Sequence, residues 1–264
     1  MARYTHGHAE AVLRSHRWRT AENSAGHLLA HLRPGTALLD VGSGPGTITA
    51  DLAALVAPGR VTALEATPEA LALTAAELER RGLAADLVVG DAHALPFPDD
   101  SFDVVHAHQV LQHLADPVQA LGEMRRVCRP GGTVAVRDSD YGGFTWWPES
   151  PGLDRWLDLY GQAARANGGE PDAGRRLLGW ARAAGLEAPR AGSATWCFAT
   201  PEDRAWWGGM WADRILDSDL ARQLVAEGRC DAAELEEVSV AWRAWSEHPD
   251  GWFVVLHGEL VATV

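Results

Sequence analysis

The chain has 264 residues, of which 47% are hydrophobic and 22% charged, and its formal net charge is −13. This length fits one large α/β domain or two small ones, and it lets the chain bury a sizeable core without a disulfide or metal staple. The acidic balance argues against nucleic acid or an anionic membrane as the partner, because both attract a basic surface.

The N-terminal half predicts a helical cap followed by an alternation of strands and helices. Apolar residues recur at helical spacing over 3–33, so residues 1–36 are expected to form the cap. From residue 37 short apolar runs alternate with helical segments, which predicts a doubly wound, Rossmann-like parallel sheet over 37–138. The expected strands are 37–41, 61–65, 85–89, 102–107 and 133–138, and the expected helices 47–56, 68–81 and 117–128.

The pattern changes after residue 139. Residues 140–172, rich in Trp, Gly and Pro, are expected to form an irregular or partly helical cap. A helix over 174–184, a strand over 189–198, helices within 201–247 and a terminal strand or hairpin over 252–261 complete the prediction. Because no internal repeat or low-complexity linker separates these parts, we expect a single domain over 1–264, in which 139–264 supply additions around the 37–138 core.

A glycine-rich turn follows the first predicted strand. It reads Asp40-Val41-Gly42-Ser43-Gly44-Pro45-Gly46 and leads directly into a helix. Glycines let the backbone turn sharply and let a ligand approach closely, while the helix N-terminus offers free N–H groups. The spacing G-x-G-x-G differs from the dinucleotide fingerprint, and neither the spacing nor the lysine of a P-loop is present. The turn therefore predicts a ligand other than a dinucleotide or a nucleoside triphosphate.

Three acidic residues stand at the ends of three successive strands. Asp40 suits the cationic amino group of a methionine moiety. Glu65, 19 residues after Gly46, can accept hydrogen bonds from both hydroxyls of a ribose. Asp91 can accept from an adenine amine while the N–H of Ala92 donates to a ring nitrogen. Each alone would more often be a solvated loop charge, but together they predict an S-adenosylmethionine (AdoMet) site.

These motifs resemble those of class I AdoMet-dependent methyltransferases, in the branch of ubiquinone and menaquinone C-methyltransferases and natural-product methyltransferases. The resemblance covers about residues 35–138 and includes Val41–Thr47, Gly90–Asp103, Val110–Pro117 and Arg126–Gly132. It implies a seven-stranded, mostly parallel sheet whose last strand runs antiparallel. Arg129 replaces the lysine usual in the R-V-L-K-P-G-G turn, a change expected to matter little.

The resemblance also implies roles for individual residues. Gly42, Ser43 and Gly44 would line the methionine portion of AdoMet. Glu65 with Ala66 would hold the ribose, Asp91 with Ala92 the adenine, and His108 would border the sulfonium. The resemblance fixes the cofactor and leaves the methyl acceptor open.

A general base helps methyl transfer when the acceptor carries a proton. All 23 basic residues are arginine, which excludes lysine chemistry. The candidate bases are His6, His8, His106, His108, His113, Asp138 and Tyr141. His113 ranks first because it follows the fourth strand in the loop expected over the cofactor, whereas His106 lies within that strand and is expected to be packed. A phenol or thiol acceptor would need no base.

Tryptophan is concentrated outside the motif core. None of the 12 tryptophans lies in 35–138, and aromatic side chains give ligand pockets apolar area and shape. Most of them are expected to pack the added helices or an oligomer interface, with Trp146 and Trp147 as the best pocket candidates. Tyr4, in the N-terminal cap, is expected either to contact the methionine end of AdoMet or only to lie on a packing helix. The acceptor is predicted to be a small hydrophobic or aromatic molecule.

Three widely spaced cysteines without a C-x-x-C pair suit a reducing compartment and indicate no metal site. The N-terminus shows no apolar signal-peptide region, and no apolar run approaches the ~20 residues of a membrane span. We therefore expect a cytoplasmic protein without membrane insertion, and homo-oligomer formation is left open. The alternative function is an AdoMet-binding protein without methyl transfer, such as a cyclase, scaffold or sensor.

Overall fold

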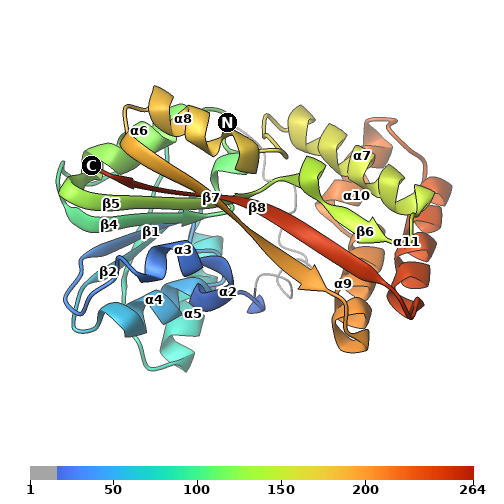
Figure 1. Cartoon of the computed structure of the whole chain (residues 1–264), viewed down its shortest axis with the longest axis horizontal. Coiled ribbons are helices and arrows are strands. Elements are labelled where there is room, and N and C mark those ends of the chain that lie inside the picture. The colour runs from blue at the N-terminus through green and yellow to red at the C-terminus, as the bar shows by residue number, and fades with distance from the viewer. Residues whose placement is uncertain (1–16) are drawn as a thin grey trace.

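The computed structural model describes residues 17–264, and one sheet runs through them (Figure 1). Its strand order is β3-β2-β1-β4-β5-β8-β6, and β7 pairs with the other edge of β8. The first five strands of the chain are parallel, whereas β8 is antiparallel to β5, to β6 and to β7. The strands are β1 (Leu38–Val41), β2 (Val61–Glu65), β3 (Asp86–Val89), β4 (Phe102–His108), β5 (Cys128–Ser139), β6 (Thr145–Trp147), β7 (Glu187–Phe198) and β8 (Trp252–Thr263).

This arrangement confirms the predicted Rossmann-like sheet and its antiparallel last strand. The C-terminal segment is a single long strand and not a hairpin, and the short β6 adds one strand to the expected seven. Strands β1, β2 and β4 coincide closely with the predicted runs because they are buried and apolar. Strand β3 lies where predicted although it is largely exposed, and β5 begins earlier than predicted, at Cys128.

Helices cover both faces of the sheet. In Figure 1, α6 and α8 lie above it and α3, α4 and α5 below, while α7, α9, α10 and α11 form a second lobe. The helices are α2 (Ala21–Ser24), α3 (Gly26–Leu29), α4 (Thr47–Val56), α5 (Pro68–Arg80), α6 (Pro117–Val127), α7 (Pro151–Ala166), α8 (Leu177–Ala183), α9 (Pro201–Arg214), α10 (Asp219–Ala226) and α11 (Ala232–Glu247). Three short 3₁₀ turns are η1 (Leu111–His113), η2 (Tyr141–Gly143) and η3 (Gly174–Arg176).

The N-terminal cap differs from the prediction where the structure describes it. Residues 17–33 hold two four-residue helices in place of one continuous helix. Thr20 starts α2 as a capping box, and Ala25 ends it by leaving helical geometry at φ −131°. The rest of the predicted helix, with Tyr4, His6 and His8, lies outside the described residues.

Residues 140–172 are more regular than their composition indicated. They contain α7, a 16-residue helix whose N-cap Ser150 accepts a hydrogen bond from the N–H of Leu153. Pro151 at the first helical position and the buried Leu153, Trp156 and Leu159 follow the helical rules for capping and periodicity. The many Trp, Gly and Pro residues of the region made this helical pattern hard to recognise in the sequence.

The second lobe has an aromatic core of its own. Trp156 is fully buried and meets Trp211 edge to face at 4.6 Å and Trp242 at 4.9 Å between ring centroids. Such edge-to-face pairs stabilise a core beyond their apolar area. Trp146 stacks on Phe253 at 5.5 Å within this core. Most tryptophans of the lobe therefore pack its helices, as expected.

Candidate active site

The glycine turn connects β1 to α4 in the backbone geometry that its glycines allow. Gly42, Gly44 and Gly46 have φ of 74°, 56° and 82°, values that other residues rarely adopt. A Cβ on Gly42 would meet a methyl of Val110 at 2.4 Å, and one on Gly46 would meet Cα of Thr74 at 2.8 Å. A Cβ on Gly44 would meet nothing within 4 Å. Gly44 is thus the position where the loop faces open space and can admit a ligand.

Thr74, a residue of helix α5, is hydrogen-bonded to two residues of the glycine turn. Thr74 donates its hydroxyl hydrogen to the carbonyl of Gly44 at 2.8 Å. Since that hydrogen is in use, Ser43 is the donor in the 2.8 Å bond between the two hydroxyls. Ser43 is therefore a buried support of the loop in this structure, and its predicted contact with the methionine portion stays a prediction.

Asp40 lies beneath the loop and already has protein partners. One carboxylate oxygen contacts Nδ1 of His106 at 2.8 Å, and the other accepts from the hydroxyl of Thr49 at 2.6 Å. Asp40 is 3% exposed. Its predicted contact with the cofactor's amino group stays a prediction, and these bonds assign it the additional role of tying β1 to β4 and α4. They also explain why His106, predicted to be packed, is fully buried.

Glu65 ends β2 beside the same loop. Its Oε1 accepts from the N–H of Gly44 at 2.6 Å, and its Oε2 accepts from the N–H of Ala66 at 3.1 Å. Two N–H donors hold the carboxylate next to the open position of the loop. This placement fits the predicted ribose contact, because each carboxylate oxygen can accept a second hydrogen bond.

Asp91 and Ala92 follow β3 at the same edge of the sheet. Oδ1 of Asp91 accepts from the N–H of His93 at 2.9 Å and contacts the His93 ring at 2.7 Å. These hydrogen bonds lower the pKa of Asp91, so its carboxylate is ionised at neutral pH. Asp91 is exposed and Ala92 is buried, with a relative exposure of 9%. An exposed carboxylate beside a buried backbone suits the predicted adenine contact.

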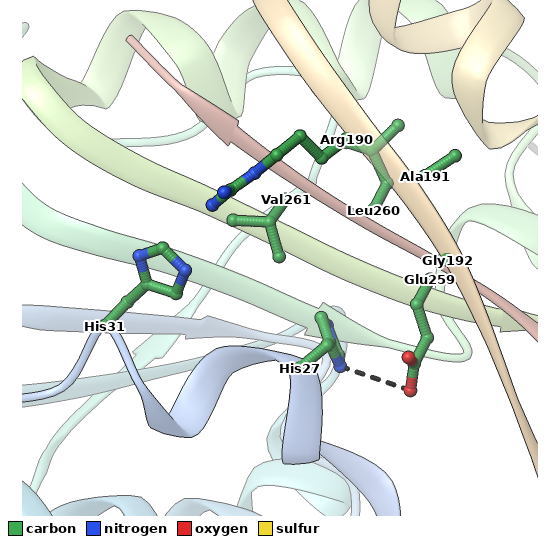
Figure 2. A pocket seen from close by; sticks show the side chains of 8 residues that line it. All are labelled: His27, His31, Arg190, Ala191, Gly192, Glu259, Leu260 and Val261. Atoms are coloured by element: carbon green, nitrogen blue, oxygen red, sulfur yellow. Dashed lines mark ion pairs between the residues drawn. The ribbon is translucent and has the colours of Figure 1, made fainter.

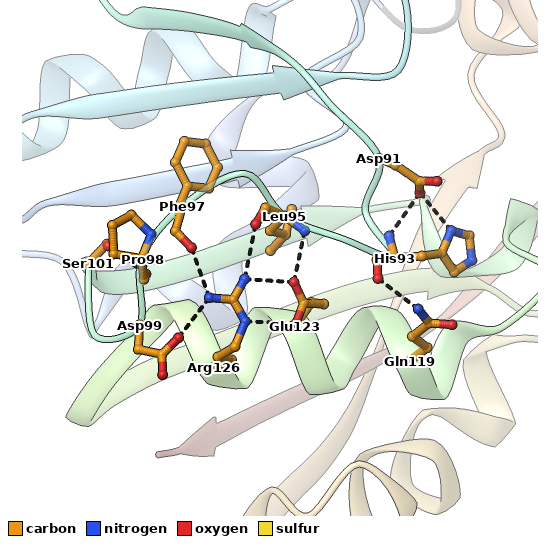
Figure 3. Close-up of polar contacts among 10 residues, drawn as sticks. All are labelled: Asp91, His93, Leu95, Phe97, Pro98, Asp99, Ser101, Gln119, Glu123 and Arg126. Carbon is orange, nitrogen blue, oxygen red and sulfur yellow. Dashed lines mark hydrogen bonds and ion pairs between the residues drawn. The ribbon is translucent and has the colours of Figure 1, made fainter.

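Side chains of α6 hold the loop that carries Asp91 (Figure 3). Arg126 donates to the carbonyls of Leu95 and Phe97 at 3.0 and 2.8 Å. The same guanidinium pairs with Glu123 at 2.7 Å, and that carboxylate in turn accepts from the N–H of Leu95. The loop therefore has a fixed shape before any ligand binds.

We expect Arg126→Met to lower the affinity for AdoMet about tenfold. Fixing the backbone of a single residue costs about 1–2 kcal/mol, and a tenfold change in affinity corresponds to about 1.4 kcal/mol. Titration calorimetry measures the affinity, and hydrogen exchange over residues 91–99 measures the loop. Arg125→Met, at an exposed neighbour on the same helix, is the matched control. Equal affinity in both variants would show that the loop needs no support from Arg126.

Comparison with known proteins identifies the family to which this site belongs. Residues 39–136 match the family model described as a methyltransferase domain. An uncharacterized methyltransferase of Schizosaccharomyces pombe is 34% identical over 98% of this chain and 95% of its own length. The chain belongs to the class I AdoMet-dependent methyltransferases.

Two further similarities concern the motif region and the fold of this methyltransferase. The ubiquinone/menaquinone biosynthesis C-methyltransferase UbiE of Hahella chejuensis is 34% identical over 50% of this chain and 52% of its own length. The structure of the YcgJ protein from Bacillus subtilis superposes with a TM-score of 0.61 at 19% identity, covering 92% of this chain and 98% of that one. The first similarity agrees with the branch indicated by the motifs, and the second shows the fold.

His108 ends β4 at the centre of the strand-end edge. It is 6% exposed, and neither ring nitrogen has a hydrogen-bond partner among residues 17–264. Burial, and then the positive charges of Arg19 and Arg137, lower its pKa well below the ordinary value. His108 in the methyltransferase is thus a neutral imidazole with both nitrogens available. Its predicted place beside the sulfonium stays a prediction.

His113 ends η1, and its Nε2 contacts the Gln112 amide at 3.0 Å. Burial, with a contribution from Arg19, lowers the pKa of His113 to about 3. A base of that strength binds a proton poorly at neutral pH. His113 stays a prediction as the catalytic base, and this low pKa speaks against it.

Asp138 is the other buried acid at the strand ends. Its Oδ1 accepts from the N–H of Gln112 at 3.0 Å, while its Oδ2 has no partner in the described part of the chain. Burial raises the pKa of Asp138 to about 8. Asp138 is therefore mainly protonated at neutral pH and holds η1 against β5.

The tryptophan at the strand ends is Trp196 of β7, which the sequence analysis did not single out. Its ring centroid lies 6.0 Å from that of His108. Trp147, predicted to line the pocket, is instead 54% exposed on β6. The signal for Trp196 was the alternation of β7, where Trp196 and Phe198 are buried and Cys197 is exposed.

A separate hollow of about 250 Å³ lies between α3 and the β7–β8 pair (Figure 2). His27 and His31 face Arg190 across it, and Glu259 at its edge is 3.5 Å from Nδ1 of His27. No residue of the glycine loop lines it, so it is distinct from the AdoMet site. Within residues 17–264, no cluster of His, Cys, Asp or Glu is arranged to hold a metal, and no helix is long and apolar enough to cross a membrane.

Proposed function

We propose that this methyltransferase methylates a small hydrophobic or aromatic molecule at an oxygen, nitrogen or carbon atom. The observation that carries the proposal is the position of Trp196 beside His108 at the strand ends. Trp196 meets Trp18 at 5.2 Å, and Trp18 meets Phe198 at 5.6 Å. Aromatic side chains here give an acceptor a flat apolar surface.

In this proposal AdoMet is held by Gly42 to Gly44, Glu65 and Asp91, and it supplies an electrophilic methyl group. The open space at Gly44 and the carboxylates at two neighbouring strand ends fit such a ligand. The protein contributes orientation and exclusion of water, which supply much of the rate of a displacement reaction. We propose that residues 1–264 act as one domain in the cytoplasm, without a nucleic-acid partner.

The test is a turnover assay with isotope-labelled AdoMet. Purified protein is incubated with a small-molecule extract, with RNA and with protein, and both S-adenosylhomocysteine (SAH) and the labelled product are measured. We expect SAH to accumulate only with the extract, and the label to be found in an apolar small molecule. Label in RNA or protein would contradict the proposed acceptor class, and AdoMet binding without SAH formation under any condition would favour the non-transferring alternative.

Asp91→Ala is expected to lower the affinity for AdoMet between about tenfold and 100-fold. The reason is the lost adenine contact, because a hydrogen bond to a charged group contributes about 1.5–3 kcal/mol. Titration calorimetry at neutral pH measures the change. Asp86→Ala is the control, since Asp86 is an exposed carboxylate on β3, the strand before Asp91, and pairs with the exposed Arg60. An unchanged affinity in Asp91→Ala would remove adenine recognition from this residue.

A further inference from the structure

A row of polar side chains crosses one face of the sheet at the acceptor side. His108 of β4 is the lateral neighbour of Arg137 of β5, and Arg137 is the lateral neighbour of Glu259 of β8. His257 of β8 lies opposite Ser139, two positions nearer the carboxyl end of β5. Laterally paired residues point to the same face of a sheet. We call His108, Arg137, Trp196 and His257 the strand-end cluster.

Within the cluster, the ring of Trp196 lies against the other side chains. Its ring centroid is 4.3 Å from that of His257 and 4.9 Å from the guanidinium carbon of Arg137. The guanidinium of Arg19, from the N-terminal segment, lies 5.6 Å from the same ring. Two arginines thus lie over one indole, and the N–H of that indole donates to the carbonyl of Asn23 at 2.7 Å.

The strand-end cluster contains a buried arginine, Arg137, and a second arginine, Arg19, lies against it. Arg137 is 1% exposed, and its charged partner is Glu259 at 3.3 Å, which also pairs with His27. Burial, and then the charges of Arg137 and Arg19, lower the pKa of His108 and that of His257, so both rings are neutral. Asp138 adds no balancing charge, because its high pKa keeps it mainly protonated. Buried positive charge of this kind favours a negative ligand.

The cluster also has unused hydrogen-bonding groups. Both ring nitrogens of His108 and Nη1 of Arg137 are buried, and none of the three has a partner within residues 17–264. His106, two residues before His108 on the same strand, differs because its Nδ1 is paired with Asp40. Buried polar atoms normally have partners, so unsatisfied ones mark a place for a ligand or water.

We propose that the strand-end cluster binds an anionic oxygen, a carboxylate or phenolate, of an aromatic acceptor, with Trp196 against its ring. Arg137 and His108 donate hydrogen bonds to the oxygen, and the two arginines balance its charge. An oxygen bound as an anion has no proton to lose, which agrees with the weak basicity of His113. This inference rests on the proposed function and narrows its substrate class.

The test measures binding of simple aromatic probes to protein saturated with SAH. Benzoate represents the carboxylate, 4-nitrophenolate the phenolate, and benzamide is the neutral counterpart of benzoate. We expect at least one anion to bind about tenfold or more tightly than benzamide in titration calorimetry. The stronger of the two anions identifies the source of the oxygen. Equal binding of all three probes, or binding of none, would overturn the inference.

Arg137→Met and His108→Phe test the residues. Each is expected to weaken binding of the preferred anion about tenfold, and Arg137→Met, at a residue without a predicted cofactor contact, is expected to leave the affinity for SAH unchanged. Arg190→Met, which removes one exposed arginine from β7, should change neither. If Arg137→Met does not fold, the anion affinity of His108→Phe is compared with that of the wild type. This variant keeps an aromatic ring of similar size. An equal loss of SAH and anion binding would assign the cluster to the cofactor and overturn the inference.

The turnover assay separates failure of this inference from failure of the proposed function. SAH formed with neutral aromatic acceptors, and not with acidic ones, would overturn the anionic acceptor and leave the small-molecule methyltransferase in place. Label transferred only to RNA or protein would overturn both the anionic acceptor and the proposed methylation of a small molecule.

Discussion

Gly44→Ala should lower the affinity for AdoMet between about fivefold and 100-fold. The added Cβ meets no protein atom within 4 Å, so it projects into the space that the loop leaves for the ligand. An extra methyl group in a close-packed contact costs about 1–3 kcal/mol, which corresponds to that range. The N–H of residue 44 is retained, and with it the bond to Glu65. Titration calorimetry with AdoMet measures the change.

Gly35→Ala is the matched control for this experiment. Gly35 also has a positive φ, of 91°, and a Cβ there also meets nothing within 4 Å, but the residue lies before β1 and away from the loop. Both variants should therefore lose similar stability from backbone strain, of about 1–2 kcal/mol. Only Gly44→Ala should lose AdoMet affinity. Equal AdoMet binding by the two variants would mean that the ligand does not approach Gly44.

Asp138→Asn should make the protein more stable than wild type at pH 9, and by a smaller margin at pH 5. The pKa of Asp138 is about 8 in the folded protein against an ordinary value of 3.8. Below pH 3.8 the residue is protonated in both states and costs nothing. Between 3.8 and about 8 the unfolded state ionises first, so stability falls by up to about 1.4 kcal/mol per pH unit. Above pH 8 the loss of stability caused by Asp138 has its full value and no longer changes with pH.

Urea unfolding from pH 5 to pH 9 measures this effect. The difference in unfolding free energy between Asp138→Asn and wild type should grow with pH and level off above pH 8. Asp86→Asn, at an exposed position on β3, should show no such growth. A difference that is constant with pH would mean that Asp138 is ionised throughout the range and that its burial is compensated by a partner.

The positions of the glycine turn, Glu65 and Asp91 at strand ends could be predicted from sequence because the signals are local. Each lies at or just after the end of a short strand, and parallel strands bring their carboxyl ends to one edge of the sheet. The positions of these residues relative to one another therefore follow largely from the order of strands and turns in the sequence. What it leaves out is the set of partners beneath the loop, such as Thr49 and His106 for Asp40.

The acceptor side is not readable in the same way. Trp196, Arg137 and His257 are far apart in the chain and meet only through the register of β5, β7 and β8. No pattern in the neighbouring sequence indicates that Arg137 is buried, because an arginine near the end of a strand is usually exposed. The choice of His113 as base also rested on position alone, and only burial shows how weak that base is.

The placement of β8 has a consequence for synthesis of the chain. Strand β8 lies between β5 and β6 on one side and β7 on the other, so it joins the parallel part of the sheet to the second lobe. A nascent chain has no completed sheet in either part until β8 has left the ribosome. Before then the edges of β5 and β7 lack their partner, and open edges of that kind invite aggregation. We therefore expect a chain that lacks β8 to be prone to aggregation, whereas a chain that includes β8 covers the edges of both β5 and β7.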